Sequence, residues 1–369
     1  MKILKMVGVL VLLACAIIFP QVFTDPTVTT IAVFTLIFAA VATGWNILGG
    51  YSGYISLGHI AYFGIGAYAM ALFCLHWNIP GGYEPFLLVP LTALIAAVVS
   101  IPLGWIALRV RRHTFIVITI AMFFIIQLLA YNLIWLTNGS TGLGLPIPTD
   151  WGGYFFNYPF YYAALILLVI AVLVSWWIRN SKFGLGLLAI RDDEDRALGL
   201  GVKTVASKLA AFAIAAFFAG AAGAIYAYFV ESIYPATIFD PNFDVAVVLM
   251  VFLGGLGTIS GPILGALIME PLQQYLNLQY GENGYNLIIL GGIFLLVMLI
   301  LPRGILPTLG DLWRKYRAMR EQDTAVQAEE GMVITALPGR VGRSTAGRDE
   351  SAPTAIAPNQ NEPGEGINV

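Results

Sequence analysis

Polar residues and glycines interrupt a long apolar part of the chain between residues 46 and 69. They combine side chains that form hydrogen bonds with glycines that let the backbone bend: Asn46, Gly49, Gly50, Gly53, Ser56 and His59. A broken helix in a membrane frees backbone N–H and C=O groups, which are tolerated only inside protein or along a watery cavity. We therefore interpret these residues as part of a solute pathway or gate. Close helix packing through small residues is the alternative.

A second interruption, with the sequence GGLGTISGP, follows at residues 254–262. Its glycines and polar residues favour the same role: Gly254, Gly255, Gly257, Ser260, Gly261 and Pro262. Both interruptions contain the pattern Gly-x-Ile-Ser, which starts at Gly53 and again at Gly257. Broken helices at matching places in two halves of a chain are typical of transporter pathways. An internal repeat and a chance match of glycine-rich sequence both stay open.

Ionisable residues are scarce within the apolar runs. His59 has no carboxylate near it in the sequence, so we expect a hydrogen-bonded interior residue rather than a proton relay. Glu231 and Glu270 are expected at the outer ends of helices, and Asp240 and Asp244 in outer loops. Carriers coupled to an ion gradient usually hold ionisable groups within the membrane. The scarcity argues against such a carrier, and no catalytic constellation indicates an enzyme.

The composition is that of a membrane protein. Hydrophobic residues make up 59% of the 369 residues and charged residues only 11%, against about 25% charged in a soluble domain. Apolar runs near the bilayer-spanning length recur at 6–23, 27–48, 54–75, 86–108, 115–136, 160–178, 207–230, 245–270 and 285–301. They predict an all-α polytopic membrane protein of about 8–10 transmembrane helices, including broken or re-entrant segments. Residues 1–30 are expected to form an uncleaved N-terminal anchor helix. No basic patch with interleaved aromatic residues indicates nucleic-acid binding.

The basic residues indicate which side of the membrane each loop occupies. All 19 lysines and arginines fall in the segments 2–5, 109–112, 179–208 and 303–348. Basic loops lie on the cytoplasmic side, so these segments and both termini are predicted to be cytoplasmic. A single crossing by the run 245–270 would place the basic C-terminal part outside. This run is therefore predicted to enter and return, as a re-entrant hairpin or as two short helices.

Residues 179–206 form the clearest element outside the membrane. Apolar residues around a dense charged cluster predict a short amphipathic helix ended by Gly199. Asp192 and Arg196 are four residues apart, in the order that stabilises a helix. We interpret the loop as a docking element for a soluble partner, formed by Gly186, Ile190, Arg191, Asp192, Asp193, Glu194, Arg196, Leu198 and Gly199. A solvated connector whose charges only set the topology is the alternative.

Five stretches follow one another along the chain: LGGYSGYISLGHIAYFGIGAYA, AIRDDEDRALGLGV, KLAAFAIAAFFAGAAGAIYA, VFLGGLGTISGPILGALI and LPRGIL. Together they resemble the permeases of branched-chain amino acid ATP-driven (ABC) importers, and among these the M-type subunit. The resemblance implies a type II ABC importer-like permease domain over residues 31–310. Within it, residues 179–206 would be the loop that couples to the ATPase. Residues 321–369 lie outside the family pattern, and their composition predicts a disordered cytoplasmic tail.

The resemblance also implies a function and partners. The chain would be a multi-pass subunit in the plasma (inner) membrane that imports branched-chain or related hydrophobic amino acids. The implied partners are a second, H-type permease, two cytoplasmic ATP-binding subunits and an extracytoplasmic substrate-binding protein. The phosphate-binding motif GxxxxGK followed by Ser or Thr does not occur, so ATP is expected on the partner subunits and no cofactor on this chain. An importer of urea or short-chain amides and an ion-coupled carrier or channel are the alternatives.

Overall fold

The computed structural model describes residues 2–147, 157–280, 285–300 and 304–311, together with residues 313, 314, 316 and 320. One compact unit spans Met1–Trp313. The tail predicted at 321–369 lies outside the described residues.

Helices form almost all of the described chain. In chain order the elements are α1 (Lys2–Val22), α2 (Pro26–Ser52), α3 (Ile60–His76), the 3-10 helix η1 (Glu84–Leu88), α4 (Val89–Ala107), α5 (Arg112–Asn132), α6 (Ile134–Thr137), the 3-10 helix η2 (Gly139–Thr141), β1 (Leu143–Gly144), α7 (Asn157–Arg179), α8 (Lys182–Asp192), α9 (Glu194–Gly199), α10 (Thr204–Val230), β2 (Ser232–Ile233), α11 (Pro235–Ile238), α12 (Pro241–Gly254), α13 (Gly261–Tyr280) and α14 (Tyr285–Ile300). Among the described residues, six helices are long and apolar enough to cross a membrane. The predicted all-α polytopic fold is confirmed.

Several helices begin with a side chain that caps the first turn. The Asp25 carboxylate accepts a hydrogen bond from the Thr27 N–H at 2.8 Å, and Pro26 occupies the first helical position of α2. Asp240 and Pro241 start α12 in the same way. Such caps satisfy backbone donors that have no partner within the helix, and proline there has no N–H to leave unpaired. The local sequence therefore determines where these helices start.

Two helices form the interior of the bundle. In α2, 83% of an apolar stretch of 18 residues is buried, whereas in α5 only 22% of such a stretch is buried. Helix α10 packs against α3 so closely that a Cβ at Gly66 would overlap the Gly220 carbonyl, and one at Gly223 would overlap the Phe63 carbonyl. Small residues allow such close helix contact, and dispersion between the backbones stabilises it. Helix α2 is therefore largely enclosed, and α10 lies in close backbone contact with α3.

The run predicted to enter and return forms the two helices α12 and α13. A Cβ at Gly254 would overlap the Gly261 carbonyl, and one at Gly265 would overlap the Met250 carbonyl. Each step back along α12 thus matches a step forward along α13, so the two helices are antiparallel. The prediction of two helices broken near residues 254–262 is confirmed.

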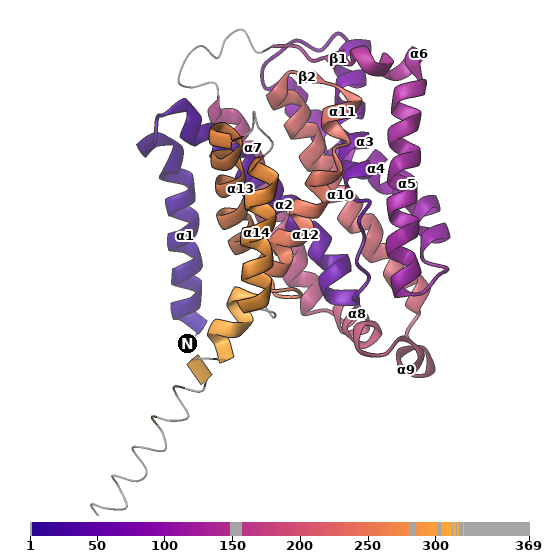
Figure 1. Ribbon diagram of the computed structural model, residues 1–369, viewed down its shortest axis with the longest axis vertical. Coiled ribbons are helices and arrows are strands. Elements are labelled where there is room, and N and C mark those ends of the chain that lie inside the picture. The colour runs from indigo at the N-terminus through magenta and orange to yellow at the C-terminus, as the bar shows by residue number, and fades with distance from the viewer. Residues whose placement is uncertain are drawn as a thin grey trace, which may run out of the picture. The chain divides into compact units, whose positions relative to one another are not determined.

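A short antiparallel ribbon ties distant parts of the chain together. Leu143 of β1 pairs with Ile233 of β2, and Gly144 pairs with Ser232. Figure 1 shows this ribbon at the top with α6 and α11, whereas α8 and α9 lie at the bottom. We call these the ribbon end and the α8–α9 end of the bundle. The ribbon was not predicted, because two-residue strands have no periodic signal in the sequence.

Candidate functional site

The first interruption lies between α2 and α3, and its position differs from the prediction. Helix α2 continues through Gly49 and Gly50, where a break was expected, and ends at Gly53 with a left-handed φ of 74°. A glycine inside a helix costs only about 1 kcal/mol relative to alanine, which the packing of a buried helix can outweigh. A left-handed residue, in contrast, ends a helix and is most easily provided by glycine. Residues 53–59 then form a non-helical segment, which we call the first break.

Side chains from other elements hold the first break in place. The Trp45 indole N–H donates to the Ser56 carbonyl at 2.8 Å, and the Leu57 N–H donates to the Thr119 hydroxyl of α5 at 3.2 Å. Ser56 and His59 are both buried. Backbone groups freed by the break thus find partners inside the protein, as a non-helical segment within a membrane requires.

The second interruption, residues 255–260, is held partly by its own residues. Gly255 and Gly257 have φ values of 124° and 77°, in the region that favours glycine. The Thr258 hydroxyl donates to the Gly255 carbonyl at 2.7 Å and accepts from the Gly261 N–H at 3.0 Å, which caps the start of α13. We call this segment the second break.

Asn46 joins α2 to the second break. Its side-chain N–H donates to the Thr258 carbonyl, and its side-chain oxygen accepts from the Gly257 N–H, both at 2.8 Å. A Cβ at Gly50 would lie only 2.8 Å from the Gly257 nitrogen, so the two backbones are nearly in contact. A single amide side chain therefore satisfies backbone groups of the second break from within the helix that precedes the first.

Two arginines of the predicted coupling loop, residues 179–206, reach the same place. The Arg191 guanidinium of α8 donates to the Gly50 carbonyl at 2.8 Å, near the C-terminal end of α2. Arg179, the last residue of α7, donates to the Gly257 carbonyl at 2.8 Å. A cation near a helix C-terminus is stabilised by the helix dipole and by unpaired carbonyls. One arginine thus holds the end of α2 just before the first break, and the other holds the second break.

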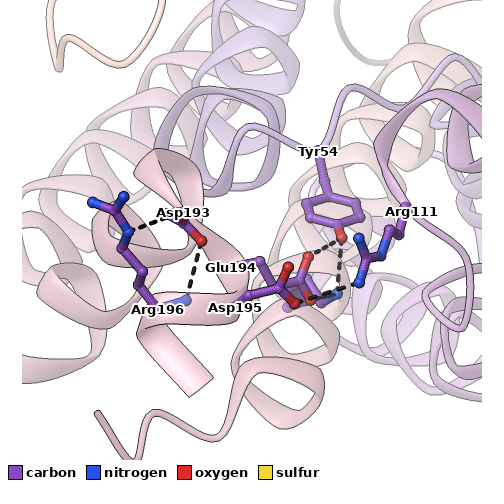
Figure 2. A network of polar contacts seen from close by, with 7 residues as sticks. Tyr54, Arg111, Asp193, Glu194, Asp195 and Arg196 are labelled. Atoms are coloured by element: carbon purple, nitrogen blue, oxygen red, sulfur yellow. Dashed lines mark hydrogen bonds and ion pairs between the residues drawn. The ribbon is translucent and has the colours of Figure 1, made fainter. Parts of the chain in front are cut away.

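The predicted coupling helix is two helices rather than one. The chain turns at Asp193, whose side chain caps α9 by accepting from the Arg196 N–H at 3.0 Å. Asp193 also forms the ion pair with Arg196, at 3.0 Å, that was predicted for Asp192. A capping aspartate favours a helix start, and here it outweighs the pairing of Asp192 with Arg196. Figure 2 shows Asp193 and Arg196 together, while Glu194 turns toward Tyr54.

Sequence comparison establishes the family. Residues 27–298 match the family model described as the permease component of the branched-chain amino acid transport system. The chain belongs to this family. The matched region includes both breaks of the permease and the whole α8–α9 segment. The predicted resemblance to branched-chain amino acid permeases is confirmed.

Individual relatives support the same conclusion. The permease is 30% identical over 323 residues to the high-affinity branched-chain amino acid transport system permease protein LivM of Escherichia coli K12, covering 80% of this chain and 73% of LivM. It is 27% identical over 286 residues to LivH of the same organism, covering 73% of this chain and 91% of LivH. It is 29% identical to the ribose import permease protein RbsC of Bacillus subtilis, over 44% of this chain and 52% of RbsC. No solved structure matches the chain.

Exposed tryptophans of the permease gather near helix ends. Trp176 and Trp177 lie at the end of α7, and Trp105, with the Arg109 guanidinium 3.7 Å from its ring centre, lies at the end of α4. Trp77, directly after the C-terminal end of α3, and Trp135 in α6 are also exposed. Tryptophan favours the boundary between lipid and water. With the spanning helices and the family, this pattern establishes a multi-pass membrane protein.

The predicted pathway residues and the predicted coupling residues differ in their exposure. Most predicted pathway residues are buried: Asn46, Gly49, Gly50, Ser56, His59, Gly254, Gly255, Gly257, Gly261 and Pro262. Gly53 is half-buried and Ser260 is exposed. Of the predicted coupling residues, Ile190 is buried, while Gly186, Arg191, Asp193 and Glu194 are half-buried. The exposed ones are Asp192, Arg196, Leu198 and Gly199. The α8–α9 segment therefore has a face packed against the bundle and a face open to a partner.

Asp244 was expected in an outer loop but is buried in α12 and only 4% exposed. Its carboxylate lies beside the backbone N–H groups of His59 and Ile60 at the start of α3, and one of its oxygens has no hydrogen-bond partner among the described residues. A carboxylate at a helix N-terminus is favourable, and α3 has no cap from its own side chains. The sequence does carry a signal for this: Asp240 followed by Pro241 predicts a helix start, which places Asp244 in the first turn.

His59 also differs from the prediction. A hydrogen-bonded side chain far from any carboxylate was expected, yet Asp244 contacts its backbone. Among the described residues, neither ring nitrogen has a hydrogen-bond partner. The ring instead packs edge-on against Phe212 and Tyr62, with centroid distances of 5.3 and 5.9 Å. Its surroundings indicate an aromatic packing role.

Glu270, expected at an outer helix end, is buried in α13 and only 1% exposed. One carboxylate oxygen accepts a hydrogen bond from the Gln274 side chain at 2.9 Å. The prediction was wrong because α13 extends ten residues beyond the apolar run that ended at 270, so Glu270 lies in the middle of the helix. The prediction from the sequence therefore placed too few carboxylates within the bundle.

Proposed function

We propose that this chain is the transmembrane permease subunit of an ATP-driven importer of branched-chain or related hydrophobic amino acids. It would form half of the translocation pathway, with a second, H-type permease forming the other half. Two cytoplasmic ATP-binding subunits would drive it, and an extracytoplasmic binding protein would deliver the substrate. Membership of the branched-chain amino acid permease family supports the substrate class. The match to both LivM and LivH supports a paired permease.

The observation that carries the proposal is the connection of residues 179–206 with the end of α2 and with the second break. Arg191 holds the Gly50 carbonyl and Arg179 holds the Gly257 carbonyl, while Asn46 joins α2 to the second break. A movement imposed on these residues would act at once on the end of α2, just before the first break, and on the second break. An importer driven by a separate ATPase needs such a connection, because the motor and the pathway are on different chains.

The proposed orientation follows from the positive charges. The α8–α9 end contains Arg109, Arg111, Arg179 and Lys182, and cytoplasmic loops are enriched in basic residues. We therefore assign the α8–α9 end, and both termini, to the cytoplasmic side of the plasma (inner) membrane. The exposed face of α9 would then meet the ATPase.

Reconstitution tests the proposed function. The full-length chain is purified together with the proteins that accompany it and placed in proteoliposomes. ATP-dependent uptake of labelled leucine is expected, and uptake of labelled urea is not. Urea uptake without leucine uptake would identify an importer of urea or short amides.

A second candidate is an ion-coupled carrier, favoured by the burial of Asp244 and Glu270. Such carriers place ionisable groups within the membrane. Here the Asp244 carboxylate lies beside backbone N–H groups at the start of α3, and one Glu270 oxygen accepts a hydrogen bond from Gln274. One oxygen of each carboxylate has no hydrogen-bond partner among the described residues. Leucine uptake by the purified chain alone, driven by a proton or sodium gradient without ATP, would establish this carrier and refute the importer.

A further inference from the structure

Three polar groups from three separate elements meet beside the first break. The Lys208 ammonium of α10 donates to a Glu194 carboxylate oxygen at 2.5 Å and to the Tyr54 hydroxyl at 3.0 Å. The Tyr54 hydroxyl in turn donates to the other Glu194 oxygen. Figure 2 shows the Tyr54 hydroxyl directed at Glu194. Each member therefore contacts both of the others.

Because Lys208 is buried, the stability of this triad depends strongly on the distances between its three members. Its side chain is 3% exposed, against 27% for Glu194. An ammonium group withdrawn from water needs a charged partner at close range, and a partner that moves away leaves a strongly unfavourable charge behind. Glu194 thus cannot shift relative to α10 without Lys208 or Tyr54 shifting with it.

The triad links α9 to the point where α2 stops being helical. Glu194 is the first residue of α9, and the rest of that helix exposes Arg196 and Leu198. Tyr54 follows Gly53, the left-handed residue that ends α2. Tyr54 is fully buried, with its ring edge-on against Phe115 of α5 at 5.3 Å. A force on the exposed face of α9 therefore reaches the first break through one inward-facing carboxylate.

We propose that Lys208 and Tyr54 are positioning residues that transmit the movement of α9 to the first break during transport. Lys208 holds the Glu194 carboxylate at a fixed place beside α10. The hydrogen bond from the Tyr54 hydroxyl to the same carboxylate makes residues 53–59 follow its movement. Both side chains are buried. The inference rests on the proposed ATP-driven import and adds the residues through which the α9 contact acts.

The test measures leucine transported per ATP hydrolysed by the complete importer in proteoliposomes. Tyr54→Phe removes the hydroxyl and keeps the ring on Phe115, and Lys208→Met removes the ammonium. We expect each variant to hydrolyse ATP and to transport about 10-fold less leucine per ATP, the size of a typical coupling between sites. The exchange Lys208→Glu with Glu194→Lys restores opposite charges and is expected to recover most of the ratio.

Tyr161→Phe is the matched control. Its hydroxyl donates to the Ala16 carbonyl at 2.7 Å, between α7 and α1, so the same atom is lost far from both breaks. This variant is expected to keep the wild-type ratio. If Lys208→Met does not assemble with its partners, Tyr54→Phe decides alone, because it removes one oxygen and no charge.

The outcomes separate this inference from the proposed function. A wild-type complex without ATP-dependent leucine uptake would refute the proposed function and the inference with it. Coupled transport by the wild type, with an unchanged ratio in Tyr54→Phe or Lys208→Met, would overturn only the inference. Equal losses in Tyr54→Phe and Tyr161→Phe would also overturn it, because they would reflect general destabilisation.

Discussion

The first and second breaks share the pattern Gly-x-Ile-Ser but are stabilised differently. Residues 53–59 are held by Trp45 of α2 and Thr119 of α5. Residues 255–260 are held by their own Thr258 and also by Asn46 of α2 and Arg179 of α7. The same short sequence therefore forms two breaks with different supports. A movement of α5 would act on the first break, whereas a movement of α7 would act on the second.

The largest expected effect comes from the hairpin that contains the second break. Gly254→Val places a side chain against the Gly261 carbonyl, a backbone group that cannot rotate away. We expect a loss of about 3 kcal/mol in the free energy of unfolding, measured by denaturation of the purified permease in mixed micelles. Gly291→Ala in α14 is the control, because a Cβ added there would meet no neighbouring atom within 4 Å. It should change the free energy of unfolding little. Equal stability of the two variants would show that the close contact is unimportant.

The next effect concerns the support of α3. Asp244→Leu removes the carboxylate that lies beside the His59 and Ile60 N–H groups, and we expect a loss of about 2 kcal/mol in the free energy of unfolding. Asp244→Asn keeps one carbonyl oxygen and should lose only about 1 kcal/mol. The same denaturation experiment compares the two. A leucine variant as stable as wild type would mean that α3 does not need this cap.

Two matched threonine variants sharpen the comparison directly. Thr258→Val removes the hydroxyl that supports the second break from within, and Thr119→Val removes the one that supports the first break from α5. Each should cost about 1 kcal/mol. Hydrogen–deuterium exchange is expected to speed up at residues 255–261 only in the first variant, and at 53–59 only in the second. Faster exchange at both breaks in either variant would show that they open together.

The last comparison separates the two faces of α9 and contains the smallest expected effect. Glu194→Gln weakens the contact with buried Lys208, and we expect a loss of about 2 kcal/mol after allowing for the partial exposure of Glu194. Arg196→Gln breaks an ion pair whose arginine side chain is 85% exposed, and should cost about 0.3 kcal/mol. Both are read from the same unfolding curves. A larger loss in Arg196→Gln would contradict the assignment of the inward face.

Much of the fold follows from local signals in the sequence. Apolar runs predicted the helices, and charge placement predicted that the run 245–270 returns as a hairpin. Aspartate–proline pairs at Asp25 and Asp240 mark helix starts. These features depend on neighbouring residues, so they can be recognised without the tertiary structure.

The rest depends on contacts between residues far apart in the chain. Gly49 and Gly50 stay helical because α2 is enclosed on all sides, which their sequence does not reveal. In the sequence, Lys208 served only as one of the basic residues that indicate membrane topology. Its partner Tyr54 lies 154 positions away, so their contact could not be predicted. A buried lysine and a carboxylate within α12 are unfavourable by themselves, and only their partners explain them.

The ribbon between β1 and β2 has a mechanical consequence. It joins the arm formed by α5 and α6 to the arm formed by α10 to α12 through backbone hydrogen bonds, reinforced by the Leu145 N–H on the Glu231 carbonyl at 2.7 Å. Separating the two groups of helices at the ribbon end would break these backbone bonds. At the α8–α9 end the connections are made by side chains instead, among them Lys208 with Glu194. The ribbon end is therefore held by the backbone itself, independently of the side chains that act at the other end.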